Sequence, residues 1–295
     1  KYSESDFGED LPKPLKKLLF AIKATPAIIT IISCADDWFG HIMSDIATPT
    51  GIPGTFLSFL KYISAEIVHI EQCLSTGINI VLIDEKGERH FLTDPNSSLR
   101  KLDLDDIQPF LKDTAEIVSF ASMFVSPLMT IPKMQQLFSE VKEKGKILAV
   151  DMTKAKKGEK IEDLAGLLPY IDYIFPNEAE IAMLTGETDP YRNAEILLEM
   201  GVKTAVIKCG EKGCVLGDET GIYLVPAVPV QKCVDTTGAG DTFVSGFLWG
   251  LSEGWKSLEC AKFACAAASC AVEIVGATGG VRFLGEIRKR YEENL

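Results

Sequence analysis

Residues 235–251 read DTTGAGDTFVSGFLWGL, a glycine-containing turn that leads straight into an apolar stretch. Three of the four residues of the turn GAGD (238–241) have little or no side chain, so an anion could approach the backbone closely. The amides at the start of the following helix would lie at the positive end of its dipole. Asp241 would lie in the first helical turn, where its carboxylate could cap the helix or face a bound anion.

An acid beside an anion-binding turn suits phosphoryl transfer to an alcohol. The amides would neutralise charge on the moving group, and the carboxylate would accept the hydroxyl proton. Because that transition state is loose, an aspartate of ordinary pKa would suffice. The alternative is a capped helix packed tightly on a strand, and short glycine motifs do not decide between the two.

From about residue 100 onward, short apolar runs alternate with helical patterns. We expect strands at 115–125, 146–152, 173–175, 204–210 and 213–226, and helices at 131–145, 161–171, 177–186, 191–200, 240–252, 257–274 and 284–293. The strand runs are apolar throughout, which is typical of a parallel sheet covered on both faces. The sequence therefore predicts an α/β fold, a three-layer αβα arrangement with a mostly parallel central sheet.

Residues 76–92, TGINIVLIDEKGERHFL, differ from this pattern. Two β-rich runs flank the turn EKGE (85–88), which predicts a hairpin and a small β appendage outside the main sheet. Residues 45–56, DIATPTGIPGTF, have no period and are expected to form a loop.

Composition limits the function classes. The chain has 295 residues, 46% of them hydrophobic, enough for the core of one large domain. A net charge of −12 argues against nucleic-acid partners and anionic membranes, and a phosphorylated ligand would need a local source of positive charge. The best apolar run, starting at Ala27, is too short to span a membrane.

The chain contains eight cysteines and three histidines, and no CxxC pair. This argues against a zinc site. Cys260, Cys265 and Cys270 share one apolar helical stretch, where free cysteine behaves as a small hydrophobe. We expect reduced thiols and a cytoplasmic protein. The chain starts at Lys1 without a methionine, so removal of a targeting peptide stays an alternative.

The longer stretch DTTGAGDTFVSGF (235–247) closely resembles the C-terminal signature of the ribokinase-like, or PfkB-type, carbohydrate kinases. Further similar segments follow the family's order: CADDWFG (34–40), the lid-like hairpin, FPNEAEIAMLTG (175–186) and VIKCGEKGCVL (206–216). The resemblance is strong over 110–282, fair over 34–92 and absent before about residue 27. It implies a single ribokinase-like domain over 1–295, with a β lid from about 74–95 and a possible contribution from N-terminal residues.

The resemblance also implies roles for residues. Asp241 would be the general base, and Gly238, Ala239 and Gly240 would form the anion hole for the γ-phosphate of ATP. Asn177 would help hold the nucleotide, and Glu180 the Mg²⁺, mainly through water. The alternative for Asn177 is a helix N-cap.

Four further positions match family sites. Lys208 and Gly210 would line the nucleotide, although Lys208 could equally be a solvated strand-end lysine. Cys265 falls near the adenine in relatives, but core packing is the favoured role. Asp235 and Thr237 match positions near a K⁺ site that backbone carbonyls near residues 275–276 would complete.

One part of the family pattern is missing. Relatives open with a strand carrying a substrate-binding aspartate, then a GGxxxN turn, and nothing before residue 40 matches. The residues that bind the acceptor therefore stay unassigned. Asp151, in AVDMTK, matches a strand end near the phosphates in relatives, and the alternative is an acid that caps a turn.

These features predict an ATP-dependent kinase that phosphorylates a hydroxyl of a small sugar. A nucleoside kinase of the same family and a non-catalytic sugar- or nucleotide-binding relative are the alternatives. A dinucleotide-binding oxidoreductase is disfavoured, because no GxGxxG follows the first strand. By analogy with relatives, a homodimer through the lid is expected.

Overall fold

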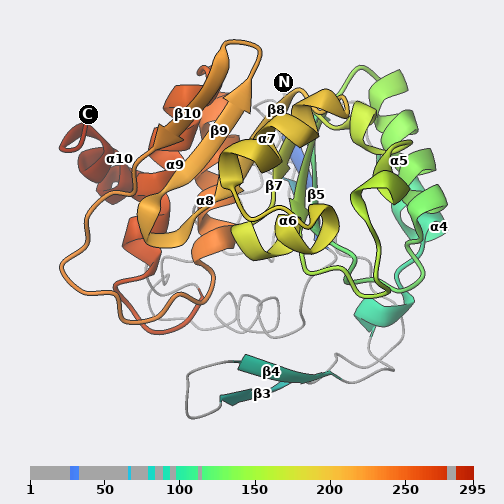
Figure 1. Ribbon diagram of the computed structural model, residues 1–295, viewed down its shortest axis with the longest axis horizontal. Coiled ribbons are helices and arrows are strands. Elements are labelled where there is room, and N and C mark those ends of the chain that lie inside the picture. Colours follow the sequence, from blue (N-terminus) through green and yellow to red (C-terminus); the bar gives the residue numbers. More distant parts are fainter. Residues whose placement is uncertain are drawn as a thin grey trace, which may run out of the picture.

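An eight-stranded sheet runs through the middle of the structure, with helices on both sides (Figure 1). The computed structural model describes residues 27–32, 66–67, 79–83, 89–93, 98–111, 115–277 and 284–295. The strands of the sheet are β1 (Ala27–Ile32), β2 (Glu66–Ile67), β5 (Ala115–Met123), β6 (Ile147–Met152), β7 (Tyr173–Phe175), β8 (Thr204–Lys208), β9 (Cys214–Asp218) and β10 (Gly221–Val225).

The strand order is β10-β9-β8-β7-β6-β5-β1-β2. All pairings from β2 to β8 are parallel, and only the β8–β9 and β9–β10 pairings are antiparallel. The prediction of a mostly parallel sheet is confirmed.

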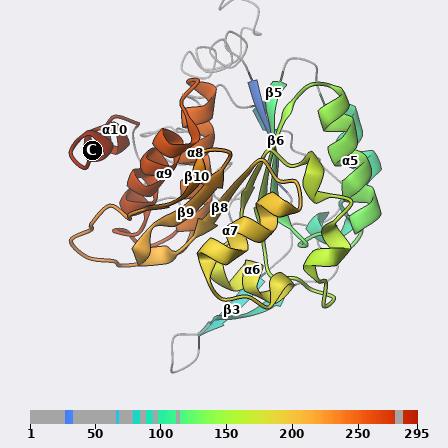
Figure 2. The same cartoon turned by 45° about the horizontal axis from the view of Figure 1, so that its top comes forward.

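Helices cover both faces of the sheet (Figure 2). They are α4 (Leu104–Ile107), α5 (Ile131–Glu143), α6 (Glu178–Thr185), α7 (Pro190–Glu199), α8 (Ala239–Ser252), α9 (Ser257–Ala271) and α10 (Leu284–Glu292). One buried cluster joins α4–α7 to the sheet, and a second joins α8–α10 to its opposite face. This is the expected three-layer αβα architecture.

The two clusters explain why the central strands have no polar alternation. Successive strand side chains point to opposite faces. Leu148 belongs to the α4–α7 cluster and its neighbour Ala149 to the α8–α10 cluster, and both are fully buried. Because neither face meets water, both sets of positions favour apolar residues.

Helices α8 and α9 pack closely against the same face. A Cβ added at Gly246 would lie 2.9 Å from the Cβ of Ala267, so the glycine allows the two helices to approach. The cysteines of α9, Cys260, Cys265 and Cys270, are buried and unpaired, as predicted. Here they act as small apolar side chains.

The predicted helix over 161–171 is wrong. That segment forms two short 3₁₀ turns, η4 (Ile161–Leu164) and η5 (Leu168–Tyr170). Pro169 cannot donate a backbone hydrogen bond and disfavours helical geometry in the residue before it, and Gly166 adds chain entropy. The other predicted helices are present within three residues at either end.

The predicted hairpin is confirmed. Strands β3 (Asn79–Ile83) and β4 (Arg89–Thr93) pair antiparallel, with Asn79 opposite Thr93 and Ile83 opposite Arg89. They form a separate two-stranded sheet, drawn apart from the main sheet in Figure 1.

Some expectations lie outside the described residues, namely the turn at 85–88, the loop at 45–56 and the segment at 34–40. For the part of the chain that the structure describes, we find no helix with the length and hydrophobicity needed to cross a membrane.

Candidate active site

The neighbouring parallel strands β6, β7 and β8 have their carboxyl ends at the same edge of the sheet, the one that runs across the strand ends. A polar residue lies at each of these three ends. Asp151 lies near the end of β6, Asn177 follows β7, and Lys208 ends β8. Asn177 and Lys208 also form an isolated parallel bridge. In open α/β sheets, ligands bind outside the carboxyl ends of the strands. We therefore expect a ligand-binding site at the carboxyl ends of β6, β7 and β8.

The glycine turn reaches this same edge and begins α8. Gly238 is the N-cap residue with φ +76°, and a Cβ there would lie 2.4 Å from the carbonyl oxygen of Ala277. Both the backbone conformation and the space therefore require glycine. At Gly240, a Cβ would lie 3.5 Å from the Nζ of Lys208. The glycine turn therefore lies within van der Waals contact of the side chain that ends β8.

The amides of the turn are not equivalent. The amide of Ala239 donates a 3.2 Å hydrogen bond to the carbonyl oxygen of Thr236, so it is engaged within the turn. No acceptor within the described ranges takes a hydrogen bond from the amides of Gly238 or Gly240. These two donors, at the start of a 14-residue helix, can meet an anion.

Asp241 lies in the first turn of α8, and its side chain reaches solvent. Removal of water by the surrounding protein, together with the negative charge of Asp151, raises the pKa of the Asp241 carboxyl to about 6. Lys208 acts in the opposite direction. An aspartate of ordinary pKa would suffice for a loose transition state, and the structure places the pKa of Asp241 above that value. A base with a pKa close to the operating pH is better suited to proton transfer.

Lys208 is not a solvated lysine. Its Nζ forms a 2.6 Å ion pair with Oδ1 of Asp151, and only 14% of the Lys208 side chain and 10% of the Asp151 side chain are exposed. Burial disfavours the ammonium, but the carboxylates of Asp151 and Glu180 more than offset this and raise the pKa of Lys208. The lysine is therefore charged, and it supplies positive charge at the edge of the sheet.

Asn177 and Glu180 form a capping box at the start of α6. Oδ1 of Asn177 accepts from the amide of Glu180, and Oε2 of Glu180 accepts from the amide of Asn177, both at 2.8 Å. The interpretation of Asn177 as an N-cap is confirmed. Burial raises the pKa of Glu180, and the charge of Lys208 opposes that shift. The box holds the Glu180 carboxylate near Lys208.

Asp235 ties the glycine turn to the segment after α9. Its Oδ1 accepts from the amide and the hydroxyl of Thr237, at 2.9 and 2.7 Å. Its Oδ2 accepts a 2.9 Å hydrogen bond from the amide of Gly276. Residues 235–237 and 276 are therefore brought together, as the family resemblance implies.

Two further predicted site residues, Gly210 and Cys265, lie outside the glycine turn and the Asp151–Lys208 pair. Gly210 begins a 3₁₀ turn with φ +57°, directly after β8 and Cys209. Cys265 is 4% exposed and interacts with the thiol of Cys214 in the core. This placement favours packing over nucleotide contact for Cys265.

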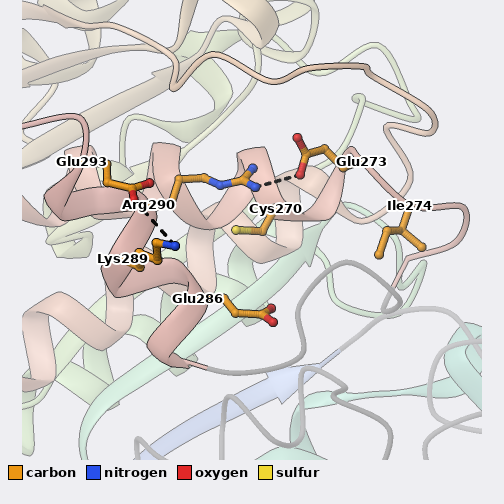
Figure 3. A pocket seen from close by; sticks show the side chains of 7 residues that line it. All are labelled: Cys270, Glu273, Ile274, Glu286, Lys289, Arg290 and Glu293. Carbon is orange, nitrogen blue, oxygen red and sulfur yellow. Dashed lines mark hydrogen bonds and ion pairs between the residues drawn. The ribbon is translucent and has the colours of Figure 1, made fainter.

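A pocket of about 400 Å³ lies elsewhere, between the end of α9 and α10 (Figure 3). Cys270 points into it, and the Glu273–Arg290 ion pair (2.8 Å) forms part of its wall. It contains none of the predicted site residues, so it is separate from the edge at β6–β8.

The pairing of Asp151 with Lys208 was not predicted. The sequence pattern indicates a strand-end acid at Asp151 and a nucleotide-side lysine at Lys208, without joining the two. A signal was available, because the carboxyl ends of nearby parallel strands lie at one edge of a sheet. Opposite charges at the ends of β6 and β8, separated only by β7, could have indicated the contact.

The sequence pattern of the family described as pfkB family carbohydrate kinase matches residues 58–282. An uncharacterised sugar kinase of Archaeoglobus fulgidus is 32% identical over 70% of this chain and 80% of its own length. A cytidine kinase of Thermococcus kodakarensis is 38% identical over 45% of this chain and 49% of its own length.

Solved structures show the same fold. A ribokinase of Arabidopsis thaliana, complexed with ribose and ATP, matches with a TM-score of 0.62 and 25% identity, over 77% of this chain and 72% of that one. A ribokinase-type protein of E. coli in complex with ATP and Mg²⁺ matches with a TM-score of 0.69 and 20% identity, over 97% of this chain and 93% of that one.

Proposed function

The chain belongs to the pfkB family of carbohydrate kinases, and we propose that it transfers the γ-phosphoryl group of ATP to a hydroxyl of a small sugar. The observation that carries the proposal is the arrangement at the start of α8. Asp241 lies in the first turn of α8, directly after the glycine turn that carries the amides of Gly238 and Gly240, and the Lys208 ammonium lies next to that turn. The base, the anion-binding donors and the positive charge are then in one place.

In the proposed reaction, Asp241 takes the proton from the acceptor hydroxyl. The oxygen of that hydroxyl forms a bond to the γ-phosphorus, and the bond to the bridging oxygen of the β-phosphate breaks, so that ADP leaves. The amides of Gly238 and Gly240 bind the oxygens of the moving phosphoryl group. Donors that are already oriented stabilise that charge without reorganisation.

The residues at the site fit a Mg²⁺ ion held mainly through water. Mg²⁺ keeps several waters and binds through one or two carboxylates together with substrate phosphates. Glu180 presents a carboxylate at this edge, although one of its oxygens serves the capping box. No group of three or more metal-binding side chains was found among the described residues. When bound with ATP, the ion would neutralise charge on the phosphates.

A K⁺ ion beside the glycine turn is part of the proposal. Asp235 and Thr237 would lie near it, and carbonyl groups around Val275 and Gly276 would complete its ligands. The hydrogen bond from Gly276 to Asp235 supports this, because it holds that segment beside the turn.

We expect ADP release to be faster in potassium chloride than in choline or tetramethylammonium chloride at equal ionic strength. A bound K⁺ would hold the turn and the 275–276 segment together, which keeps the amides oriented. The rate of ADP release measured in each salt tests this. Equal rates in all salts would remove the K⁺ site from the proposal.

The acceptor is proposed to be a sugar, with a nucleoside as the second candidate. The matching sugar kinase covers more of this chain than the matching cytidine kinase does, 70% against 45%. The β3–β4 hairpin is proposed to act as a lid over the acceptor, and a homodimer through this lid would cover its exposed edges.

A screen of ADP release over sugars and nucleosides, with ATP and Mg²⁺, tests the proposed function. We expect turnover with at least one sugar. Turnover with nucleosides alone would establish the second candidate. ATP binding by calorimetry without turnover on any acceptor would instead indicate a non-catalytic relative.

A further inference from the structure

Asp151 and Lys208 form a charged pair that crosses one strand. Asp151 comes from β6 and Lys208 from β8, and β7 lies between them. Their charged atoms lie 2.6 Å apart, and only 10% of the Asp151 side chain and 14% of the Lys208 side chain are exposed. Breaking a buried pair by removing one partner leaves an uncompensated charge, so the two groups depend on each other.

This pair places its positive end at the glycine turn. The Nζ of Lys208 lies 3.5 Å from where a Cβ of residue 240 would be, one residue before Asp241. The chain as a whole carries a net charge of −12, which repels a nucleotide triphosphate. A fixed ammonium at the anion-binding turn is the local charge that such a protein needs.

We propose that Asp151 is a positioning residue that holds the Lys208 ammonium at the Gly240–Asp241 turn, where the ammonium meets the transferred phosphoryl group. This inference rests on the proposed function. The Asp151 carboxylate accepts the hydrogen bond from Lys208 and fixes its direction. Lys208 then stabilises charge where it develops in the transition state.

The pair also acts on the base itself. Among the described residues, the charged groups that act on Asp241 are Asp151 from β6 and Lys208 from β8, while Glu180 from α6 acts on Lys208. Asp151 favours the protonated form of Asp241, and Lys208 favours the ionised form. Removing one or the other should therefore move the titration of Asp241 in opposite directions.

The first experiment follows the Asp241 carboxyl by ¹³C NMR in the free protein, its signal assigned by loss in Asp241→Asn. We expect a titration near pH 6 in the wild type, a lower midpoint in Asp151→Asn and a higher one in Lys208→Met. Unchanged midpoints in both variants would overturn the proposal. Because no substrate is present, this readout does not depend on kinase activity.

A matched control is available at the other end of the same strands, where β7 begins. Asp172, directly before β7, is also buried and forms a 2.6 Å ion pair with Lys203. Asp172→Asn weakens the ion pairs of this buried carboxylate with Lys203 and Lys142, so it should lower thermal stability but leave the Asp241 titration in place.

Kinetics separate positioning from simple structural support. Asp151→Asn should lower kcat by about 10- to 100-fold with little change in KM for ATP, because the ammonium remains but is no longer fixed. Lys208→Met should lower kcat/KM by about 10²- to 10³-fold. If Asp151→Asn and Asp172→Asn have the same kcat, the proposed role of Asp151 is wrong. Wild-type protein that phosphorylates no acceptor would instead contradict the proposed function.

Discussion

Replacing Asp241 with asparagine should lower kcat by about two to four orders of magnitude, the usual contribution of a general base. Asparagine has nearly the same shape but cannot take the hydroxyl proton. The fold should not suffer, because the Asp241 side chain is exposed and the surrounding protein already disfavours its charged form. The measurement is kcat with the best acceptor of the screen, alongside the thermal unfolding midpoint. A kcat of Asp241→Asn within tenfold of the wild-type value would show that Asp241 is not the base.

The pH dependence of the same enzyme gives an independent check. The pKa of Asp241 is raised from its ordinary value to about 6, so the carboxylate is lost as the pH falls through about 6. We expect kcat/KM of the wild type to be constant above this range and to fall below it. The residual activity of Asp241→Asn should lack this acid limb.

Replacing Gly238 with alanine should lower kcat/KM by about 10²-fold or more, the loss found when a donor to a developing oxyanion is removed. At φ +76° an alanine is strained, and its Cβ would lie 2.4 Å from the Ala277 carbonyl oxygen. Backbone atoms cannot move aside as a flexible side chain can, so the turn itself must shift. The amides of Gly238 and Gly240 would then lose their alignment.

Gly254 supplies the matched control for this variant. It has the same φ of +76°, but a Cβ added there meets nothing within 4 Å. Gly254→Ala should cost about 1–2 kcal/mol of unfolding free energy, from the left-handed conformation alone, and leave kcat/KM unchanged. Should Gly238→Ala match Gly254→Ala in both unfolding free energy and activity, the close approach at the turn has no role in catalysis.

Much of the fold could be predicted because local patterns decide it. Apolar runs such as 146–152 show strands buried on both faces, and Gly186 marks the end of α6 in a left-handed conformation. The failure at 161–171 has the same local origin, since the apolar spacing was helical but Gly166 and Pro169 favour shorter turns.

The candidate site could be predicted only in its outline. The turn at 238–241 and the cap at Asn177 are short-range features, whose hydrogen bonds join residues a few positions apart. The engagement of the Ala239 amide by Thr236 is equally local, but the spacing of the residues does not reveal it.

The sequence by itself therefore determined the layered α/β architecture, the glycine turn at the start of α8 and the residue types around it. The tertiary structure alone decided that Lys208 pairs with Asp151, 57 positions away, and that Asp241 has a pKa of about 6. The physical reason is range. Turns and caps depend on neighbours in the chain, whereas a charge responds to every group within several ångströms, whichever strand carries it.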